Sequence, residues 1–195
     1  TISHSLSAVP KIIIVKKRSD SGDWKSQWSV LGNGKSMRLD ATEAVATAST
    51  YWNDTSPTSS VFSVGTDSDI NGSSETTIAY LWSEKQGYSK FGSYTGNGNA
   101  DGPFIYLGFK PAFIMVKRTD TTNDWQIHDN TRDTFNGVTQ RLRANLSDAE
   151  ATTGAFYDFT STGVKCRNTD YSMNASGGTY IYMAFAEAPF VNSNG

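Results

Sequence analysis

The sequence predicts an all-β protein made of two tandem, internally duplicated antiparallel β-sandwich modules of jelly-roll type. Three observations support this fold class. The composition is rich in aromatic residues, at 12%, and poor in charged residues, at 18%. Short apolar runs alternate with clusters of Thr, Ser, Asn and Gly, as in strands joined by turns. The two halves also resemble each other, and as an alternative both modules could share one core in a single pseudo-symmetric sandwich.

The similarity between the halves runs along most of the chain. The segment "SLSAVPKIIIVKKRSDSGDW" at residues 5–24 aligns with "YLGFKPAFIMVKRTDTTNDW" at 106–125, an offset of about 101 residues. The segment "DSDINGSSETTIAYLW" at 67–82 aligns with "DYSMNASGGTYIYMAF" at 170–185, an offset of about 103. Two extra residues before Asn136 account for the change of offset. The halves are therefore interpreted as two copies of one structural unit.

The copies define a first module at residues 1–85 and a second at 86–195. The second module has a leading strand, "YSKFGSY" at 88–94, that has no counterpart in the first. We infer that the first module has lost this strand or takes it from upstream in a longer parent protein. Because the chain also begins with Thr1, we expect it to be a fragment or a processed product.

The other elements follow in the same order in each module. Each module begins with a run of branched apolar residues bounded by turn residues. An Asn-Gly pair, which tolerates positive φ, predicts a turn at Asn33 and at Asn136. Residues 40–49 and 145–154 are the longest helix candidates. The predicted strands are 11–18, 23–30, 36–40, 59–65 and 76–82 in the first module, and 112–119, 124–131, 139–145, 162–168 and 179–185 in the second.

One stretch of the second module, "NDWQIHDNTRD" at 123–133, holds aromatic, histidine and acidic residues together. The first module has "DWKSQW" at the equivalent place, without a histidine. The shared tryptophans, Trp24 and Trp125, are therefore expected to fill the hydrophobic interiors of their modules. We expect His128 to be a half-exposed strand residue rather than a catalytic base.

The sequence supports no catalytic or metal site. Cys166 is the single cysteine, so no disulfide forms within the chain, and we expect a buried, inert thiol. The "DSD" at 67–69 could offer oxygens to calcium, but the second module keeps only Asp170, which favours solvated turn carboxylates. Phosphate-loop, zinc-protease and nucleophile-elbow motifs are missing. We predict no enzymatic activity, no cofactor and no bound metal.

Charge and hydropathy exclude two classes of partner. The formal net charge is −2, so there is no basic surplus that would attract nucleic acid. The sequence contains no apolar run long enough to span a bilayer. We therefore predict neither nucleic-acid binding nor membrane insertion.

Several segments are specific enough to indicate a family. "GYSKFGSYTGNGNADGPFIYLGFKPAFIMVKRTD", "LSDAEAT", "TGVKCRNTD" and "NASGGTYIYMAFAEAPF" resemble a domain that recurs near the C-terminal ends of tail fibre and related virion proteins of tailed phages, notably marine phages of cyanobacteria. "SHSLSAVPKIIIVKKR" and "NGSSETTIAYLW" resemble the preceding part of the same proteins. The resemblance implies a virion-surface module in a homotrimeric fibre or tail tip, beside other tail proteins. It implies no enzymatic activity.

The leading functional hypothesis is a receptor-binding module that contacts a host surface glycan such as lipopolysaccharide. Sugar binding requires aromatic faces for C–H groups and polar side chains for hydroxyls. Aromatic residues that the repeat does not explain are the best candidates for ligand contacts: Trp28, Tyr51, Trp52 and Tyr171.

Two other functions remain open. A purely structural fibre, tail or decoration module would place its aromatic residues in protein–protein interfaces, and an unpaired strand edge in the first module would need a cover. A polysaccharide-degrading enzyme would need paired carboxylates in a cleft. Only Asp148, Glu150 and Glu43 suggest such a pair, and their spacing in the sequence does not show whether two of them form one.

Overall fold

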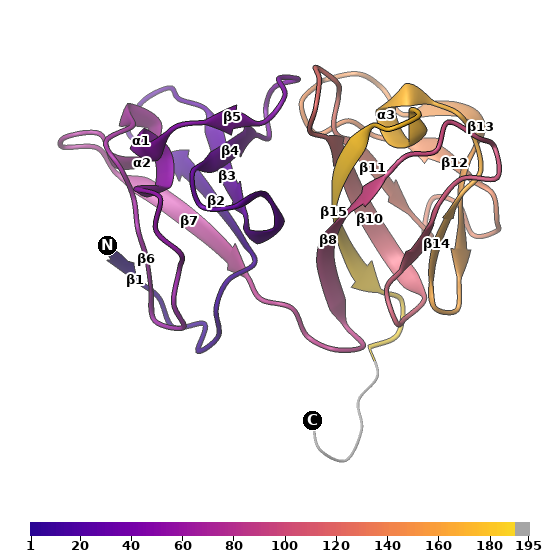
Figure 1. The fold of residues 1–195 in the computed structure, drawn as a ribbon, viewed down its shortest axis with the longest axis horizontal. Helices are drawn as coiled ribbons and strands as arrows, with labels where there is room; N and C mark the ends of the chain where they lie inside the picture. Colours follow the sequence, from indigo (N-terminus) through magenta and orange to yellow (C-terminus); the bar gives the residue numbers. More distant parts are fainter. Residues whose placement is uncertain (190–195) are drawn as a thin grey trace, which may run out of the picture. The chain divides into compact units, whose positions relative to one another are not determined.

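The computed structural model describes residues 1–189 and confirms the predicted all-β class. All of its strand pairs are antiparallel in the described part. The chain divides into two compact units, Thr1–Glu84 and Lys85–Gly195 (Figure 1). Each unit is described by itself below.

The first unit is based on a five-stranded sheet in the order β5-β4-β3-β2-β7, and a separate pair of strands, β1 and β6, lies beside it (Figure 1). The run of branched residues in β2 lies inside the sheet, between β3 and β7, and is buried on both faces. Its elements are β1 (Ile2–Ser3), β2 (Ile12–Lys17), β3 (Trp24–Trp28), the 3-10 turn η1 (Ser29–Leu31), β4 (Lys35–Arg38), β5 (Ala46–Thr47), α1 (Ser49–Trp52), β6 (Val61–Phe62), α2 (Ser68–Asn71) and β7 (Thr77–Trp82).

The second unit is a sandwich of two four-stranded sheets, ordered β11-β10-β15-β8 and β12-β13-β14-β9 (Figure 1). Side chains that alternate along the strands of both sheets meet in one core, as in other sandwiches. Its elements are β8 (Ser89–Thr95), β9 (Phe104–Tyr106), β10 (Pro111–Arg118), β11 (Gln126–Asp129), β12 (Val138–Arg141), β13 (Ala151–Thr160), β14 (Gly163–Cys166), α3 (Tyr171–Asn174) and β15 (Thr179–Ala186).

The two units pair their corresponding strands in the same register. Lys16 of β2 lies opposite Ile78 of β7. In the second unit, Lys117 of β10 lies opposite Ile181 of β15. These positions differ by the two offsets that align the halves of the sequence, so the common register is what duplication of one unit predicts.

Each unit also has a single-turn helix with the same cap. The side chain of Asp67 accepts a hydrogen bond from the backbone N–H of Asp69 at the start of α2. Asp170 accepts one from the N–H of Ser172 at the start of α3. An aspartate at this position satisfies a backbone donor that a helix leaves unpaired, which gives these turn carboxylates a structural role.

The core of the first unit lies on one face of its large sheet. Ile13 and Val15 of β2 contact the buried Trp52, Phe62 and Ile70, which come from the segments that cross this face. The second core is larger and lies between the two sheets of the sandwich. It contains Ile105, Leu107, Phe109, Ile114, Val116, Val138, Phe156, Tyr157, Phe159, Val164, Cys166, Met173, Tyr180, Tyr182, Ala184 and Ala186.

Neither of the two long helix candidates forms the expected helix. Residues 40–45 are turns and irregular structure, and Ala46 then pairs with Ser36 in the sheet. Residues 145–150 are likewise irregular, and Ala151 pairs with Arg141. Strand pairing with a neighbouring segment therefore overrides the local helix propensity of these alanine-containing segments.

The strand expected at residues 88–94 is β8. It pairs with β15 along seven residues, from Ser89 opposite Phe185 to Thr95 opposite Thr179. In the first unit the corresponding edge belongs to β7, which ends its sheet. The leading strand is therefore one difference between the two large sheets; the other is that β4 and β5 extend the first, whereas β12 and β13 lie in a separate sheet.

Candidate ligand-binding pocket

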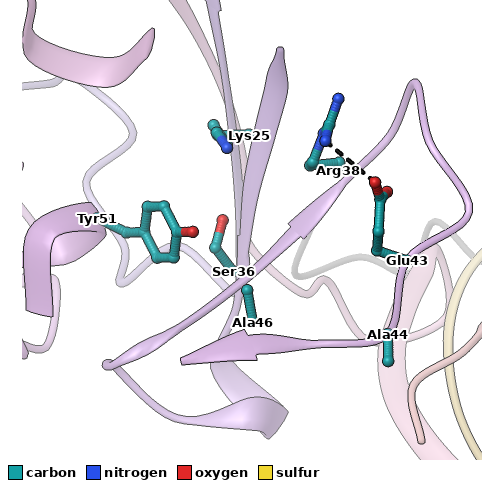
Figure 2. Close-up of a pocket in the computed structure, with 7 residues that line it drawn as sticks. All are labelled: Lys25, Ser36, Arg38, Glu43, Ala44, Ala46 and Tyr51. Carbon is teal, nitrogen blue, oxygen red and sulfur yellow. Dashed lines mark hydrogen bonds and ion pairs between the residues drawn. The ribbon is translucent and has the colours of Figure 1, made fainter. Parts of the chain in front are cut away.

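A pocket of about 190 Å³ opens in the first unit between the β3–β4–β5 side of the sheet and α1. Its lining combines charged side chains, a hydroxyl and an aromatic ring (Figure 2). The lining residues are Lys25, Ser36, Arg38, Glu43, Ala44, Ala46 and Tyr51.

Strand pairing brings the polar groups of this pocket together. Lys25 of β3 lies directly opposite Arg38 of β4, and Ser36 of β4 lies opposite Ala46 of β5. Residues directly opposite each other share a face of the sheet, as do residues two apart on one strand. These four side chains therefore lie on one face of the sheet.

Tyr51 forms the aromatic wall. It comes from α1, and Figure 2 shows its ring reaching toward Ser36 and Lys25. The ring is partly buried against the core that contains Trp52, and the Nζ of Lys25 lies 5.2 Å from its centroid. This packing fixes the ring in place while part of it remains exposed, which is the arrangement a stacking ligand requires.

Lys25 is a buried cation that carboxylates hold in place. Its Nζ lies 3.0 Å from Asp23 and 3.7 Å from Asp69. Burial on its own lowers the pKa of Lys25, but the hydrogen bond and charge of Asp23, with smaller effects from Asp67 and Tyr51, raise it above its usual value overall. The ammonium group therefore stays protonated at neutral pH.

Arg38 and Glu43 form the rim of the pocket. The guanidinium of Arg38 contacts Asp23 at 2.6 Å and Glu43 at 3.1 Å. The Glu43 side chain is largely exposed, and exposed ion pairs contribute little to stability, about 0–1 kcal/mol. At the mouth of the pocket, Arg38 and Glu43 instead provide a fixed hydrogen-bond donor and a fixed acceptor. Such a pair can bind two adjacent hydroxyls.

Two of the four predicted contact residues are buried. Trp52 is 0% exposed and belongs to the first core, and Trp28 is also buried, with its Nε1 donating to the Ser26 hydroxyl at 3.0 Å. Neither ring has a face that a ligand could reach, so their prediction as ligand contacts is wrong. A polar neighbourhood in the sequence does not keep a tryptophan at the surface.

The other two candidates belong to different units. Tyr51 lines the pocket described above. Tyr171 is 63% exposed at the start of α3 in the second unit. Its carbonyl oxygen accepts the Tyr180 hydroxyl at 2.8 Å, so the backbone is fixed while the ring lies in solvent.

The shared tryptophans differ in their surroundings. Trp125 is fully buried, as expected. Trp24 is only partly buried, and its ring stacks on Tyr80, which in turn stacks on Trp82. The prediction that both fill interiors is therefore wrong for Trp24, because residue 24 shares the outer face of its sheet with the aromatic side chains of β7.

The residues with catalytic potential are buried and inert. His128 is 0% exposed rather than half-exposed, and burial lowers its pKa to about 4. Cys166 is buried, and burial raises its pKa to about 12, so the thiolate needed for nucleophilic attack is not formed near neutral pH.

Sequence reasoning missed a polar pocket in the second unit. Its volume is about 320 Å³, and Phe135 beside it is 84% exposed. It lies at the loop that carries the two extra residues before Asn136. That length difference was the only signal for it. The lining residues are Lys110, Asn130, Asp133, Thr134, Phe135, Asn136, Phe159 and Glu187.

Within residues 1–189 no group of three His, Cys, Asp or Glu side chains is placed to hold a metal ion. No helix there has the length and apolar character needed to cross a membrane.

The protein is thus an antiparallel β protein with two units of related topology and a small polar pocket in the first unit. Residues 1–189 match the model of the family described as "Domain of unknown function (DUF7483)", and the chain belongs to that family. Neither a curated protein nor a solved structure gives a significant match.

Proposed function

We propose that this chain is a module of a phage tail fibre or tail tip that binds a host surface glycan, such as lipopolysaccharide, during adsorption. The observation that supports binding is the pocket in which the fixed ring of Tyr51 faces polar groups of β4. The sequence segments that resemble virion proteins supply the biological setting. The module would lie on the outside of the virion, in a homotrimer joined to other tail proteins.

A sugar ring fits the chemistry of this pocket. Its C–H face would stack on Tyr51, and its hydroxyls would exchange hydrogen bonds with Arg38 and Glu43 at the rim. The volume of about 190 Å³ is below the ~300–1,000 Å³ of pockets for larger ligands. One terminal monosaccharide is therefore the expected ligand unit. Several copies in one fibre would compensate for weak single sites.

The pocket supports binding rather than hydrolysis. Glycosidases hold two carboxyl groups about 5–10 Å apart across the scissile bond. Among the residues that line this pocket, Glu43 is the one carboxylate, and it is ion-paired with Arg38. The pocket thus has an acceptor for hydroxyls without a second carboxyl group, and we propose no enzymatic activity.

The test is binding to an array of bacterial surface polysaccharides, followed by titration of each positive glycan with four variants. Tyr51→Ala removes the stacking ring, Tyr51→Phe keeps it, and Glu43→Gln weakens the rim. Tyr106→Ala is the matched control, because Tyr106 is an exposed tyrosine of the second unit.

We expect Tyr51→Ala to weaken binding by about five- to tenfold, since it removes a stacking contact of ~1–1.5 kcal/mol. Glu43→Gln should weaken binding by a similar factor, since it replaces a charged hydrogen-bond acceptor with a neutral one. Tyr51→Phe and the Tyr106 control should bind like the unchanged protein. Glu43 is an exposed rim residue, so its variant tests the site even if Tyr51→Ala unfolds. Glycan binding that survives both changes, or no glycan binding at all, would refute the proposal.

An assembly role within a fibre or tail is the second candidate function. One observation favours it: β7 is an edge strand of the first unit's large sheet, and among residues 1–189 no strand pairs with its outer side. Native proteins usually cover or blunt such edges.

A further inference from the structure

In the second unit, β8 covers the edge that β15 would otherwise expose. The N–H of Gly96 donates to the carbonyl of Gly178 at 2.8 Å, at the end of the β8–β15 ladder. Hydrogen-bonded pairs alternate along an antiparallel ladder. The residues of β15 whose backbone groups hydrogen-bond to β8 are therefore every second residue after Gly178, namely Tyr180, Tyr182 and Ala184.

In the first unit the equivalent backbone groups point outward. The N–H of Arg18 donates to the carbonyl of Thr76 at 2.8 Å. Every second residue of β7 counted from Thr76 therefore hydrogen-bonds to β2 through its backbone. The residues between them direct their N–H and C=O groups away from β2, and these are Thr77, Ala79 and Leu81. Within residues 1–189 no strand pairs with this side of β7.

A pocket of about 270 Å³ adjoins the same edge. It lies on the core side of the sheet, and Ile70, Thr77 and Ala79 are among the residues that line it. By the sequence offset of about 103, Ile70 corresponds to Met173 and Thr77 to Tyr180.

In the second unit a tyrosine of β8 occupies the corresponding place. The ring of Tyr94 stacks on Tyr180 at 4.9 Å, and its hydroxyl donates to the carbonyl of Met173 at 2.8 Å. The counterparts of both contact residues, Thr77 and Ile70, line the pocket of the first unit. The open edge and the pocket are thus two parts of the position that β8 fills in the second unit.

On the outer face of the sheet, too, β7 has side chains that no neighbouring strand covers, unlike β15 beside β8. Ile78 and Tyr80 are 37% and 41% exposed, whereas their counterparts Ile181 and Met183 are buried. Ile181 lies opposite Ser93 and Met183 lies opposite Phe91 in the β8 pairing. Two apolar side chains of β7 are therefore left in water where a β8-like strand would lie beside them.

We propose that the edge of β7 and the adjoining pocket form a docking site for an extended polypeptide strand that runs antiparallel to β7. The strand has the side-chain pattern of β8, with a small residue opposite Ala79 and an aromatic residue opposite Thr77 that enters the pocket. Main-chain hydrogen bonds give such strand addition its affinity, and the pocket gives it specificity. A row of backbone donors and acceptors matches a strand and not a sugar, so this site does not depend on the glycan pocket.

The test uses the full chain and a synthetic peptide with the sequence of residues 88–95, YSKFGSYT. Residue-resolved amide hydrogen exchange is measured while the peptide is titrated. We expect binding to slow exchange at Thr77, Ala79 and Leu81. A peptide with alanine in place of Tyr94 should bind about tenfold more weakly or worse, because the pocket then stays unfilled.

Backbone methylation of the peptide provides a matched pair of controls. N-methyl groups at Gly92 and Tyr94 remove the donors that face β7 and should abolish protection. N-methyl groups at Phe91 and Ser93 face away from β7 and should leave protection in place.

Three results would overturn the proposal. The first is no protection of these amides at millimolar peptide, and the second is equal loss of binding with both methylation patterns. The third is concentration-dependent protection of the same amides without peptide, which would assign the edge to a second copy of the chain. Loss of glycan binding would change none of these measurements, so the two proposals fail separately.

Discussion

The burial of His128 makes the stability of the second unit depend on pH. The imidazole lies between the rings of Phe156 and Tyr157, each 5.1 Å away, and its Nδ1–H donates to the Gln140 carbonyl at 2.9 Å. Burial lowers the pKa of His128 to about 4, against the opposing effect of the Gln140 bond. The charges of Arg132 and Arg141 lower it further, while Asp133 raises it.

The pH dependence of the free energy of unfolding follows from the difference between the folded and unfolded pKa values of His128. In the unfolded chain His128 takes up its proton near its ordinary pKa of 6.5, whereas the folded protein resists protonation until about pH 4. Its contribution is therefore fully present above pH 6.5 and is lost as the pH falls through about 4. The difference between the two pKa values corresponds to about 3 kcal/mol in total, of which ~2 kcal/mol is lost by pH 5.

Urea unfolding at pH 7.5, 6, 5 and 4.5 measures this loss, with His128→Gln as the variant that removes the titrating group. We expect the free energy of unfolding of the unchanged protein to fall more steeply than that of the variant, by about 2 kcal/mol between pH 7.5 and 5. Carboxylates titrate in both proteins, so the difference isolates the histidine. The control is His4→Gln, which changes the other histidine of the chain. Parallel pH profiles for the unchanged protein and His128→Gln would refute the reasoning.

Three further changes have definite expected outcomes. Trp52→Ala leaves a cavity in the first core, where Trp52 is fully buried, so urea unfolding should show a loss of about 3–5 kcal/mol; a loss below ~1 kcal/mol would contradict that packing. Cys166, whose pKa burial raises to about 12, should react with a thiol reagent at pH 8 only after unfolding, and equal labelling of folded and unfolded protein would disprove its burial. Gly92→Val places a Cβ 2.7 Å from the Tyr182 hydroxyl oxygen and should lower the melting temperature by the equivalent of about 1–3 kcal/mol, whereas Ser93→Ala, on the other face of β8, should have little effect.

Most strands of both units follow from the sequence because two independent signals agree, but β1, β5, β9 and β13 were not predicted. Apolar runs of strand length predict where β2 and β10 lie, and the offsets between the halves predict which residues of the two units are equivalent. The offset of about 101 carries Lys16 to Lys117, and the offset of about 103 carries Ile78 to Ile181. Lys16 lies opposite Ile78 in the first unit, and their equivalents Lys117 and Ile181 lie opposite each other in the second. Repetition of a pattern is thus informative about register as well as about secondary structure.

The helices show where local sequence is insufficient. The segment at 40–49 contains several alanines, but pairing of Ala46 with Ser36 forms β5 instead. The single turns α2 and α3 are shorter than any helix that periodicity can detect. Asp67 and Asp170 were the residues from which these turns could have been predicted, since an aspartate before a short apolar segment can cap a helix.

The candidate pocket was predicted in part. Tyr51 was identified because the repeat does not explain it, whereas Lys25 and Arg38 were not, because only strand pairing places them beside it. Trp28 and Trp52 were misjudged because the sequence around an aromatic residue does not reveal which way its side chain points. Exposure depends on the face of the sheet and on the segments that cross it.

The strands β7 and β15 correspond in the two units, and the edge that β8 covers on β15 has no partner strand on β7 among residues 1–189. Residue-resolved hydrogen exchange of the free, dilute chain tests this difference most directly. The account predicts fast exchange at Thr77, Ala79 and Leu81 together with slow exchange at Tyr180, Tyr182 and Ala184. Equally slow exchange in both sets, or fast exchange in both, would contradict it.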